Sequence, residues 1–230
     1  MLGFKKREAN NPRDRKNPTV YVFDLRHKIK ESGDIYMRYI PAVNIKSYEG
    51  TSSYDLYSLL LKERMIMLTG EIDDNLAEIV CAELIYLDAK DPDLPLTIFI
   101  DSPGGSVTSG MAIYDIMKTI KAPVKTVGLG LCASMGAFLL AAGDKGYRFA
   151  YPNAEIMIHQ PLGQTQGQVS DLEIMTRRFI GLKAKLNQIL AAETGKDLAE
   201  IEKDTDRDNF LTAEEALAYG LIDGIIEAKV

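Results

Sequence analysis

The sequence from Arg64 onward alternates short apolar runs with stretches that space apolar residues three or four positions apart. The runs Met65–Leu68, Leu96–Ile100 and Pro123–Leu129 have the length and composition of buried strands. Amphipathic patterns follow the first two runs: Leu76, Val80, Leu84 and Leu87, then Ile113, Ile116, Met117 and Ile120. Such alternation is typical of strand-turn-helix units around a mainly parallel sheet, so we predict an α/β fold.

A third unit follows, with a short apolar helix over Ser134–Ala142 that Gly143 ends. Tyr147–Ala150 and Glu155–Ile158 have the composition of two further strands on either side of a Pro152-Asn153 turn. The second of these strands places His159 at its end.

The segment after His159 leads into a long helix with a regular apolar face. Ser170 and Glu173 match the S-x-x-E capping box and predict that the helix begins there. The apolar face is a heptad seam with alternating spacings of three and four: Leu172, Met175, Phe179, Leu182, Leu186 and Ile189. The seam favours packing against a helix of a second subunit, although packing on the chain's own core is the commoner arrangement.

Composition excludes several classes of protein. With 230 residues and 46% apolar side chains, the chain suits one α/β domain with a short appendage. Charged residues interrupt stretches such as Leu76–Leu87 well before the roughly 18 residues that a bilayer span needs. The net charge of −6 argues against general nucleic-acid binding. Cys81 and Cys132 lack CxxC spacing, so we expect no disulfide scaffold, no metal site and a reducing, cytoplasmic location.

Residues 1–39 differ in charge from the rest of the chain, with ten Lys and Arg against five Asp and Glu. They lack the apolar core of a secretory signal, and their acidic residues argue against an organellar transit peptide. Two interpretations are almost equally favoured: a processed or flexible leader, and a short edge strand over Thr19–Leu25 that pairs elsewhere.

Two residues have the chemistry of a nucleophile and its base. Of the two histidines, His27 lies in the basic leader, which leaves His159 as the candidate imidazole base. Ser134 lies between a strand and a helix in Gly130–Gly136, where a nucleophile is exposed at the positive end of a helix dipole. The alternatives are a surface histidine and a serine that caps the helix. Cys132 stands where the G-x-S-x-G motif of α/β-hydrolases requires glycine, which disfavours that family.

A second turn, Ser102-Pro103-Gly104-Gly105, follows the neighbouring predicted strand. Its glycines let backbone N–H groups point outward, and with the N–H of Met135 they would form an oxyanion hole of two donors. Both turns follow the carboxyl ends of parallel strands, where open sheets of this kind place their sites. We therefore expect the two turns to meet at one site.

A carboxylate should orient the imidazole, and the sequence offers three candidates: Asp204, Asp206 and Asp208. Asp208 is weakly favoured, because the nearby Phe210 and Leu211 would bury it. The alternative interpretation of the whole stretch is a solvated acidic turn before a helix cap at Thr212.

Residues 40–230 closely resemble the ClpP family, the proteolytic subunits of the caseinolytic (Clp) serine proteases. The shared motifs are Ile40-Pro41, Tyr54-Asp55-Leu56-Tyr57, Leu61-Lys62-Glu63-Arg64, Asp101–Gly105, Ala133–Leu140, Met157–Gly163 and Asp204–Phe210. The resemblance implies an α/β fold of the ClpP/crotonase-like type. In this fold a spiral of strand-turn-helix units carries a protruding handle helix, here over about residues 159–192, and residues 1–39 form a leader or propeptide-like extension.

The same resemblance assigns roles to individual residues. It implies that Ser134 is the nucleophile, His159 the general base and Asp208 the carboxylate behind it. It places the oxyanion hole at the N–H groups of Gly105 and Met135. It places a ring-to-ring ion pair at Arg207 and a strand-like substrate site in the handle: Gly163, Gln164, Thr165, Gln166 and Gly167.

Members of the family form two stacked heptameric rings, and a AAA+ unfoldase of the ClpX, ClpA or ClpC type feeds unfolded proteins into the chamber. The resemblance therefore implies a homo-oligomeric, ATP-dependent serine endopeptidase that needs no cofactor and acts on unfolded polypeptides and short peptides. The chain itself has no G-x-x-x-x-G-K-[ST] motif, so the unfolding energy must come from a partner. The unfoldase would dock at Phe99, Val127, Leu129, Phe149, Tyr151 and Ile226.

The sequence departs from the family pattern in three places. Thr97 and Thr119 replace larger side chains near the expected docking surface, Gly50–Ser53 lacks the usual Glu-Arg pair, and the leader is longer than usual.

Two other functions compete with the peptidase. A crotonase-like acyl-CoA enzyme would need a catalytic Glu or Asp and a CoA groove, and a catalytically silent ring subunit would typically lack one of the three catalytic residues.

Overall fold

A computed structural model describes residues 19–23, 41–47 and 50–227, and divides the chain into two compact units, Met1–Leu60 and Leu61–Val230. The first unit contains an antiparallel sheet of order β1-β2-β3, formed by Thr19–Phe23, Ala42–Ser47 and Gly50–Asp55. Helix α1 (Leu56–Lys62) follows it. A strand therefore exists within the predicted Thr19–Leu25 segment, paired to β2. The leader boundary expected near residue 40 and His27 both lie outside the described residues.

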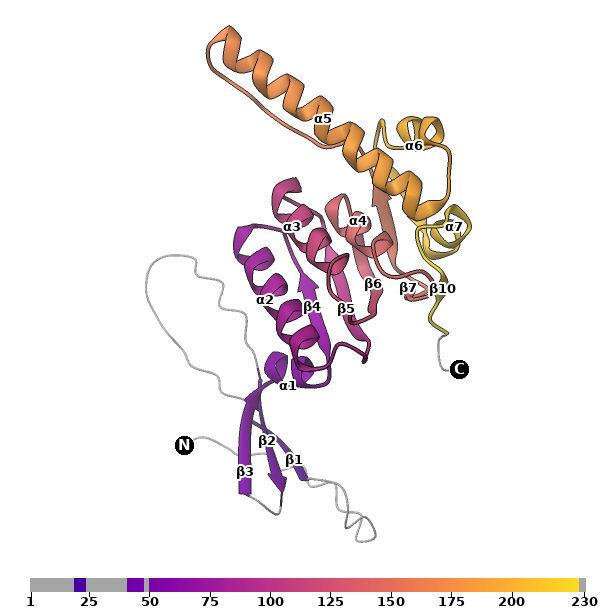
Figure 1. Cartoon of the computed structure of the whole chain (residues 1–230). Coiled ribbons are helices and arrows are strands. Elements are labelled where there is room, and N and C mark those ends of the chain that lie inside the picture. The colour runs from indigo at the N-terminus through magenta and orange to yellow at the C-terminus, as the bar shows by residue number, and fades with distance from the viewer. Residues whose placement is uncertain (1–18, 24–40, 48–49, 228–230) are drawn as a thin grey trace, which may run out of the picture. The chain divides into compact units, whose positions relative to one another are not determined.

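The second unit is built on a seven-stranded sheet, in which five strands have the order β10-β7-β6-β5-β4 (Figure 1). Strand β8 pairs with β6, and β9 pairs with β8. Its strands are β4 (Met65–Thr69), β5 (Leu96–Ser102), β6 (Val124–Ala133), β7 (Arg148–Ala150), β8 (Glu155–Ile158), β9 (Asn209–Thr212) and β10 (Gly224–Ile225). All strand pairs in it are parallel except β8 with β9. The predicted α/β fold with a mainly parallel sheet is confirmed.

Six helices belong to the described part of this unit: α2 (Asp74–Lys90), α3 (Val107–Met117), α4 (Met135–Ala141), α5 (Val169–Thr194), α6 (Leu198–Asp204) and α7 (Ala213–Tyr219). Helices α2, α3 and α4 lie side by side over one face of the sheet (Figure 1). Helix α2 begins at Asp74, because the side chain of Asp73 caps it by accepting a hydrogen bond from the N–H of Leu76 at 2.8 Å. Helix α3 ends at Met117, so the last predicted residue of its face, Ile120, lies beyond the helix.

Strand β6 is longer than predicted, and its length matters for the site. The sequence indicated a strand that ends at Leu129, but β6 continues to Ala133. It does so because it has two successive partners on the same edge: β7 pairs with Thr126–Gly128, and β8 pairs with Leu131–Ala133. The two strands predicted around Pro152-Asn153 therefore both exist, and each lies parallel to a different part of β6.

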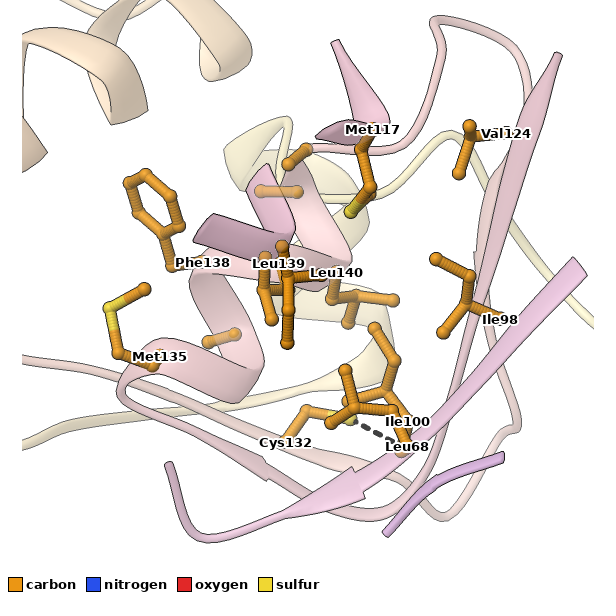
Figure 2. Close-up of a cluster of buried hydrophobic side chains, with 14 of the residues drawn as sticks. Leu68, Ile98, Ile100, Met117, Val124, Cys132, Met135, Phe138, Leu139 and Leu140 are labelled. Carbon is orange, nitrogen blue, oxygen red and sulfur yellow. Dashed lines mark hydrogen bonds between the residues drawn. The ribbon is translucent and has the colours of Figure 1, made fainter. Parts of the chain in front are cut away.

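The core lies between the sheet and these helices. Leu68, Ile98 and Ile100 from the strands pack beneath Leu139 and Leu140 of α4, and all five are fully buried (Figure 2). Burial of each such side chain contributes about 1.5–3 kcal/mol to folding. Every residue of α4 is buried, so the residue that precedes this helix has a rigid support.

Helix α5 corrects one prediction. Ser170 and Glu173 do not form a capping box, because the helix begins at Val169 and its N-cap is Gln168, which makes no capping side-chain bond. The helix projects well beyond the sheet, and the extended segment before it runs alongside its first half (Figure 1). Leu186 is the one buried residue of the predicted seam, and the other five seam residues are partly exposed.

Candidate active site

Ser134 joins the end of β6 to the start of α4 in a conformation that is rare for residues other than glycine. Its φ is 55° and its ψ is −120°. Backbone hydrogen bonds hold it there: its N–H donates to the carbonyl of Met157 at 2.8 Å, and its carbonyl accepts from the N–H of Phe138 at 3.0 Å. Its side chain makes no helix-capping bond, so the hydroxyl is not used as a cap. A strained backbone that the surrounding structure holds in place is typical of functional sites.

The hydroxyl of Ser134 instead contacts His159. His159 Nε2 lies 2.9 Å from Ser134 Oγ, and the His159 side chain is only 11% exposed. The parallel register of β6 and β8 explains the meeting, because Ala133 lies opposite Met157 and both functional residues lie just beyond the paired ends. Sequence reasoning placed Ser134 and His159 at strand ends, and the sheet brings those ends together.

Asp208 completes a chain of three side chains. Its Oδ1 lies 2.9 Å from His159 Nδ1. Strand β9 runs antiparallel to β8, with Asn209 opposite Ile158. Asp208 precedes Asn209 and His159 follows Ile158, so these two residues are neighbours. The register therefore selects one acid out of the three that the sequence left open.

The other two acids have different partners. Asp204 accepts a hydrogen bond from the Tyr219 hydroxyl at 2.9 Å, and burial together with that bond and the charge of Asp204 raises the pKa of Tyr219. Asp206 lies 3.7 Å from Lys183. The reason that the sequence offered for Asp208 was wrong, since its side chain is 63% exposed and Phe210 is exposed as well.

The two glycine-containing turns are in direct contact, as predicted. A methyl group added to Gly104 would lie 2.6 Å from Ser134 Cβ and 3.1 Å from the nitrogen of Met135. Gly104 has a φ of 93°, and its N–H donates to the Ser102 hydroxyl at 3.1 Å, which shapes the turn. Within the described residues, the N–H groups of Gly105 and Met135 have no backbone acceptor. Both N–H groups therefore stay candidates for the predicted oxyanion hole.

Cys132 is not a competing nucleophile, although it lies two residues from Ser134. Its side chain is fully buried in the core, and its thiol donates to the carbonyl of Ile100 at 3.1 Å (Figure 2). Burial raises the pKa of this thiol to about 12. A thiol that stays protonated and inaccessible is inert.

Two hollows meet at Ser134 and His159. The first is an apolar pocket, lined by Val107, Met135, Phe138, Ile158, Leu186 and Leu190 besides those two residues. The second is a groove of about 370 Å³ that includes Gly105 and the half-buried Phe179 and Leu182 of α5. A polypeptide lying across Ser134 would therefore have the open groove for its side chains, whereas the apolar pocket, with a volume of about 20 Å³, has room for about one water molecule.

The pocket contains one polar residue that sequence reasoning missed. Asn187 is 2% exposed, its Oδ1 lies 3.2 Å from the Thr205 hydroxyl, and its Nδ2 has no hydrogen-bond partner. The sequence did not single it out, because two amides, Asn187 and Gln188, lie between Leu186 and Ile189, and only the fold shows that Asn187 is the buried one. Arg178 in the groove was also missed, because nothing in a single helical sequence shows which side faces the site.

The handle residues expected to bind substrate are exposed. Gly163 to Gly167 form no strand in the structure, and they precede α5 as an extended segment. A side chain at Gly163 would collide with the ring of Phe179, at 2.5 Å, so this segment lies close against the helix. Arg207 is almost fully exposed, and its nearest described acid is Asp206 at 3.9 Å.

The residues expected to dock an unfoldase lie on neighbouring strands. Phe99 is opposite Val127, and Val127 is opposite Phe149, so the three form a row across β5, β6 and β7. Phe149 and Leu129 are partly exposed, Tyr151 is exposed, and Ile226 is partly exposed. Val127, however, is only 1% exposed and presents almost no surface to a partner.

Neither a membrane-spanning helix nor a metal site is found among the described residues. No helix among them combines the length and the apolar character that crossing a bilayer requires. No three His, Cys, Asp or Glu side chains among them gather in an arrangement that would hold a metal ion.

The chain matches the model of a known protein family. The model of the Clp protease family matches residues 48–229, which includes Ser134, His159, Asp208 and both turns.

Proposed function

The chain belongs to the Clp protease family, and from this premise we propose that Ser134, His159 and Asp208 are the catalytic residues of a serine peptidase. The family implies serine-type peptide hydrolysis. The observation that carries the residue assignment is the unbroken contact chain from Ser134 Oγ to His159 Nε2 and from His159 Nδ1 to Asp208 Oδ1, each 2.9 Å long. The match to proteases favours this reaction over acyl-CoA chemistry.

The geometry suits attack on a peptide carbonyl. Asp208 accepts a hydrogen bond from the Nδ1–H of His159, which leaves Nε2 free to take the proton of the Ser134 hydroxyl as Oγ attacks. The N–H groups of Gly105 and Met135 would donate to the oxyanion that forms. His159 then gives its proton to the leaving amine, and an acyl-enzyme on Ser134 remains. Water hydrolyses this ester by the same steps, so proton and charge balance without a cofactor.

The handle supports the binding of extended polypeptide. Its segment from Gly163 through Gln164, Thr165 and Gln166 to Gly167 is exposed and has no strand partner among the described residues. A substrate that pairs with this backbone would gain affinity from main-chain hydrogen bonds whatever its side chains. Such binding suits a peptidase that accepts unfolded polypeptides and short peptides.

Assembly is part of the same proposal. We expect two stacked heptameric rings in the cytoplasm that enclose the sites, with Arg207 in ring-to-ring ion pairs and a AAA+ unfoldase of the ClpX, ClpA or ClpC type on the apical surface. The partly exposed Phe99, Leu129 and Phe149 support docking there, whereas Val127 would contribute through packing alone. We also propose that residues 40–230 form the protease domain and that residues 1–39 are a removable leader.

Replacement of the nucleophile tests the residue assignment. Ser134→Ala should reduce hydrolysis of short fluorogenic peptides by roughly 10⁶-fold, because the three side chains act as a unit. Ser170→Ala, an exposed serine of the handle, is the matched control and should keep full activity. Particle size by native mass spectrometry should be the same for both variants.

Covalent labelling separates an active enzyme from a silent ring subunit. A fluorophosphonate probe should modify Ser134 in the wild-type protein, and peptide mass spectrometry would locate the adduct. Retained peptidase activity in Ser134→Ala, or a labelled serine elsewhere, would end the assignment.

A further inference from the structure

The groove beside Ser134 has a positive charge and no negative one on its walls. Arg178 of α5 lines it together with Ser134, His159 and Gly105, and no Asp or Glu is among its lining residues. Arg178 is a permanent cation, because a guanidinium does not lose its proton in proteins. A substrate bound at Ser134 therefore meets this charge.

Among the residues that the structure describes, Arg178 has only a weak partner. One of its terminal nitrogens donates to the hydroxyl of Thr108 at 3.3 Å, across the groove and from a residue 70 positions away. Thr108 lies in the first turn of α3, so two separate elements hold the guanidinium over the groove. A neutral hydrogen bond of this length does not neutralise the charge, and a carboxylate would be a stronger acceptor.

The neighbouring residue on the same helix, Arg177, differs because a carboxylate balances its charge. Arg177 lies 3.7 Å from the carboxylate of Glu173 one turn earlier, and its Nε also donates to the Glu173 carbonyl. Arg177 does not line the groove. The two arginines thus differ in environment but hardly in sequence, and this makes Arg177 a matched control.

We propose that Arg178 makes the site selective for substrates that carry a carboxylate close to the scissile bond. The inference rests on the peptidase function proposed above. The guanidinium would leave Thr108 and bind the carboxylate with two parallel N–H donors, a geometry that suits arginine better than lysine. The carboxylate is either an Asp or Glu side chain or the free C-terminus of a short peptide.

Peptide hydrolysis measures the selectivity directly. We would compare kcat/KM for one fluorogenic peptide with Glu, Gln or Lys placed in turn at each position near the scissile bond. At one position or more, Glu should be favoured over Gln by about threefold, as for a partly exposed ion pair. Arg178→Gln should remove the preference, Arg178→Glu should transfer it to Lys, and Arg177→Gln should keep it.

Two further experiments identify which carboxylate is recognised and whether the preference is electrostatic. Peptides with a free and with an amidated C-terminus separate a terminal carboxylate from a side-chain carboxylate. Raising the ionic strength to about 1 M, where the Debye length falls to about 3 Å, should reduce the preference, whereas a preference based on shape would persist. Equal preference in Arg178→Gln and Arg177→Gln would overturn the proposal.

A binding measurement keeps this inference separate from the peptidase proposal. Fluorescence anisotropy would follow a labelled Glu-containing peptide and its Gln counterpart on Ser134→Ala, with and without Arg178→Gln. Tighter binding of the Glu peptide that Arg178→Gln abolishes supports the role of Arg178 even if wild-type protein hydrolyses no peptide, a result that would overturn only the proposed function. Equal binding of the two peptides to Ser134→Ala would overturn the role of Arg178 while leaving hydrolysis untouched.

Discussion

Two regions of the second unit differ in the burial of their apolar side chains. The first, the body, lies around β5, β6 and α4, and the second, the handle, consists of residues 160–168 and the first half of α5. The body buries them: Ile98, Leu139 and Leu140 have no exposed surface. The handle leaves them exposed, and Leu162 is 83% accessible. The core around β5, β6 and α4 is therefore complete within one chain, whereas the handle has apolar surface that a single chain does not cover, as the proposed ring assembly requires; Ile79 and Ile85 of α2 are likewise exposed.

The proposed site lies where these two regions meet. Ser134 and the two turns belong to the body, while Arg178, Phe179 and Leu182 line the groove from the handle. The chemistry thus depends on the rigid region, and the access and selectivity depend on the incomplete one. Each of the following experiments breaks or sharpens this division.

Of these experiments, the one with the largest expected effect replaces Asp208, the exposed end of the contact chain. Asp208→Asn should reduce kcat/KM by about 10⁴-fold, because an amide cannot hold the imidazole in the same tautomer. The melting temperature should hardly change, since the side chain is mostly exposed. Asp206→Asn, two residues earlier and not in contact with His159, should retain nearly full activity. Similar losses in both variants would show that the turn as a whole, and not Asp208, supports the activity.

The next effect compares core and handle directly. Ile98→Ala should lower the free energy of unfolding by about 2–5 kcal/mol, because it leaves a cavity in the packed body (Figure 2). Leu162→Ala in the handle should change it by less than about 0.5 kcal/mol. Urea denaturation at one fixed protein concentration would test both. A large loss for Leu162→Ala would mean that the handle is part of the cooperative fold.

A largely buried ion pair is connected to the last turn of α5. Arg148, which is buried, donates to both oxygens of Asp223 and also to the carbonyl of Glu193 in the last turn of α5. Asp223→Asn should cost about 1–3 kcal/mol, since it leaves the buried guanidinium without its counter-charge. Arg177→Gln, which removes one member of an exposed pair, should cost much less. Equal losses would show that burial of the Arg148 pair adds nothing.

The same pair predicts a dependence on pH. Burial alone would raise the pKa of Asp223, but the hydrogen bonds and the charge of Arg148 outweigh it, so the pKa is lowered from the ordinary 3.8. The pair therefore stabilises the fold fully above that ordinary value, and the contribution is lost as the pH falls through the lowered pKa. Thermal unfolding below pH 4 should show a steeper loss for wild type than for Asp223→Asn. Parallel curves would contradict this.

The smallest effect on folding is expected on the exposed face of α5. Ile174→Ser and Ile180→Ser should each change the unfolding free energy by less than about 0.5 kcal/mol, because both side chains are exposed in the single chain. If the rings meet through the handle, the double variant should form smaller particles in native mass spectrometry. Unchanged assembly would show that this face is not an interface.

Predictions that depended on neighbouring residues were mostly right, and so was the expected contact between the two turns, whereas other long-range features were missed. Strands β4 and β8 and the buried face of α2 follow from the local apolar pattern. The capping box at Ser170 and Glu173 was wrong, because a match of two residues does not exclude a helix whose N-cap, Gln168, lies two positions before Ser170. The extension of β6 was missed, since it depends on β8, which is more than twenty residues further along the chain.

The sequence by itself determined the order of the units, the turns that permit outward N–H groups, and a serine and a histidine at strand ends. These features depend on side chains that are close together along the chain. The family resemblance already favoured Asp208 over Asp204 and Asp206, but only the tertiary structure gives the physical reason for its contact with His159, 49 residues away, because the antiparallel register of β8 and β9 sets that contact. The tertiary structure also decided which of two adjacent arginines faces the groove, because the orientation of α5 depends on its packing against the rest of the unit.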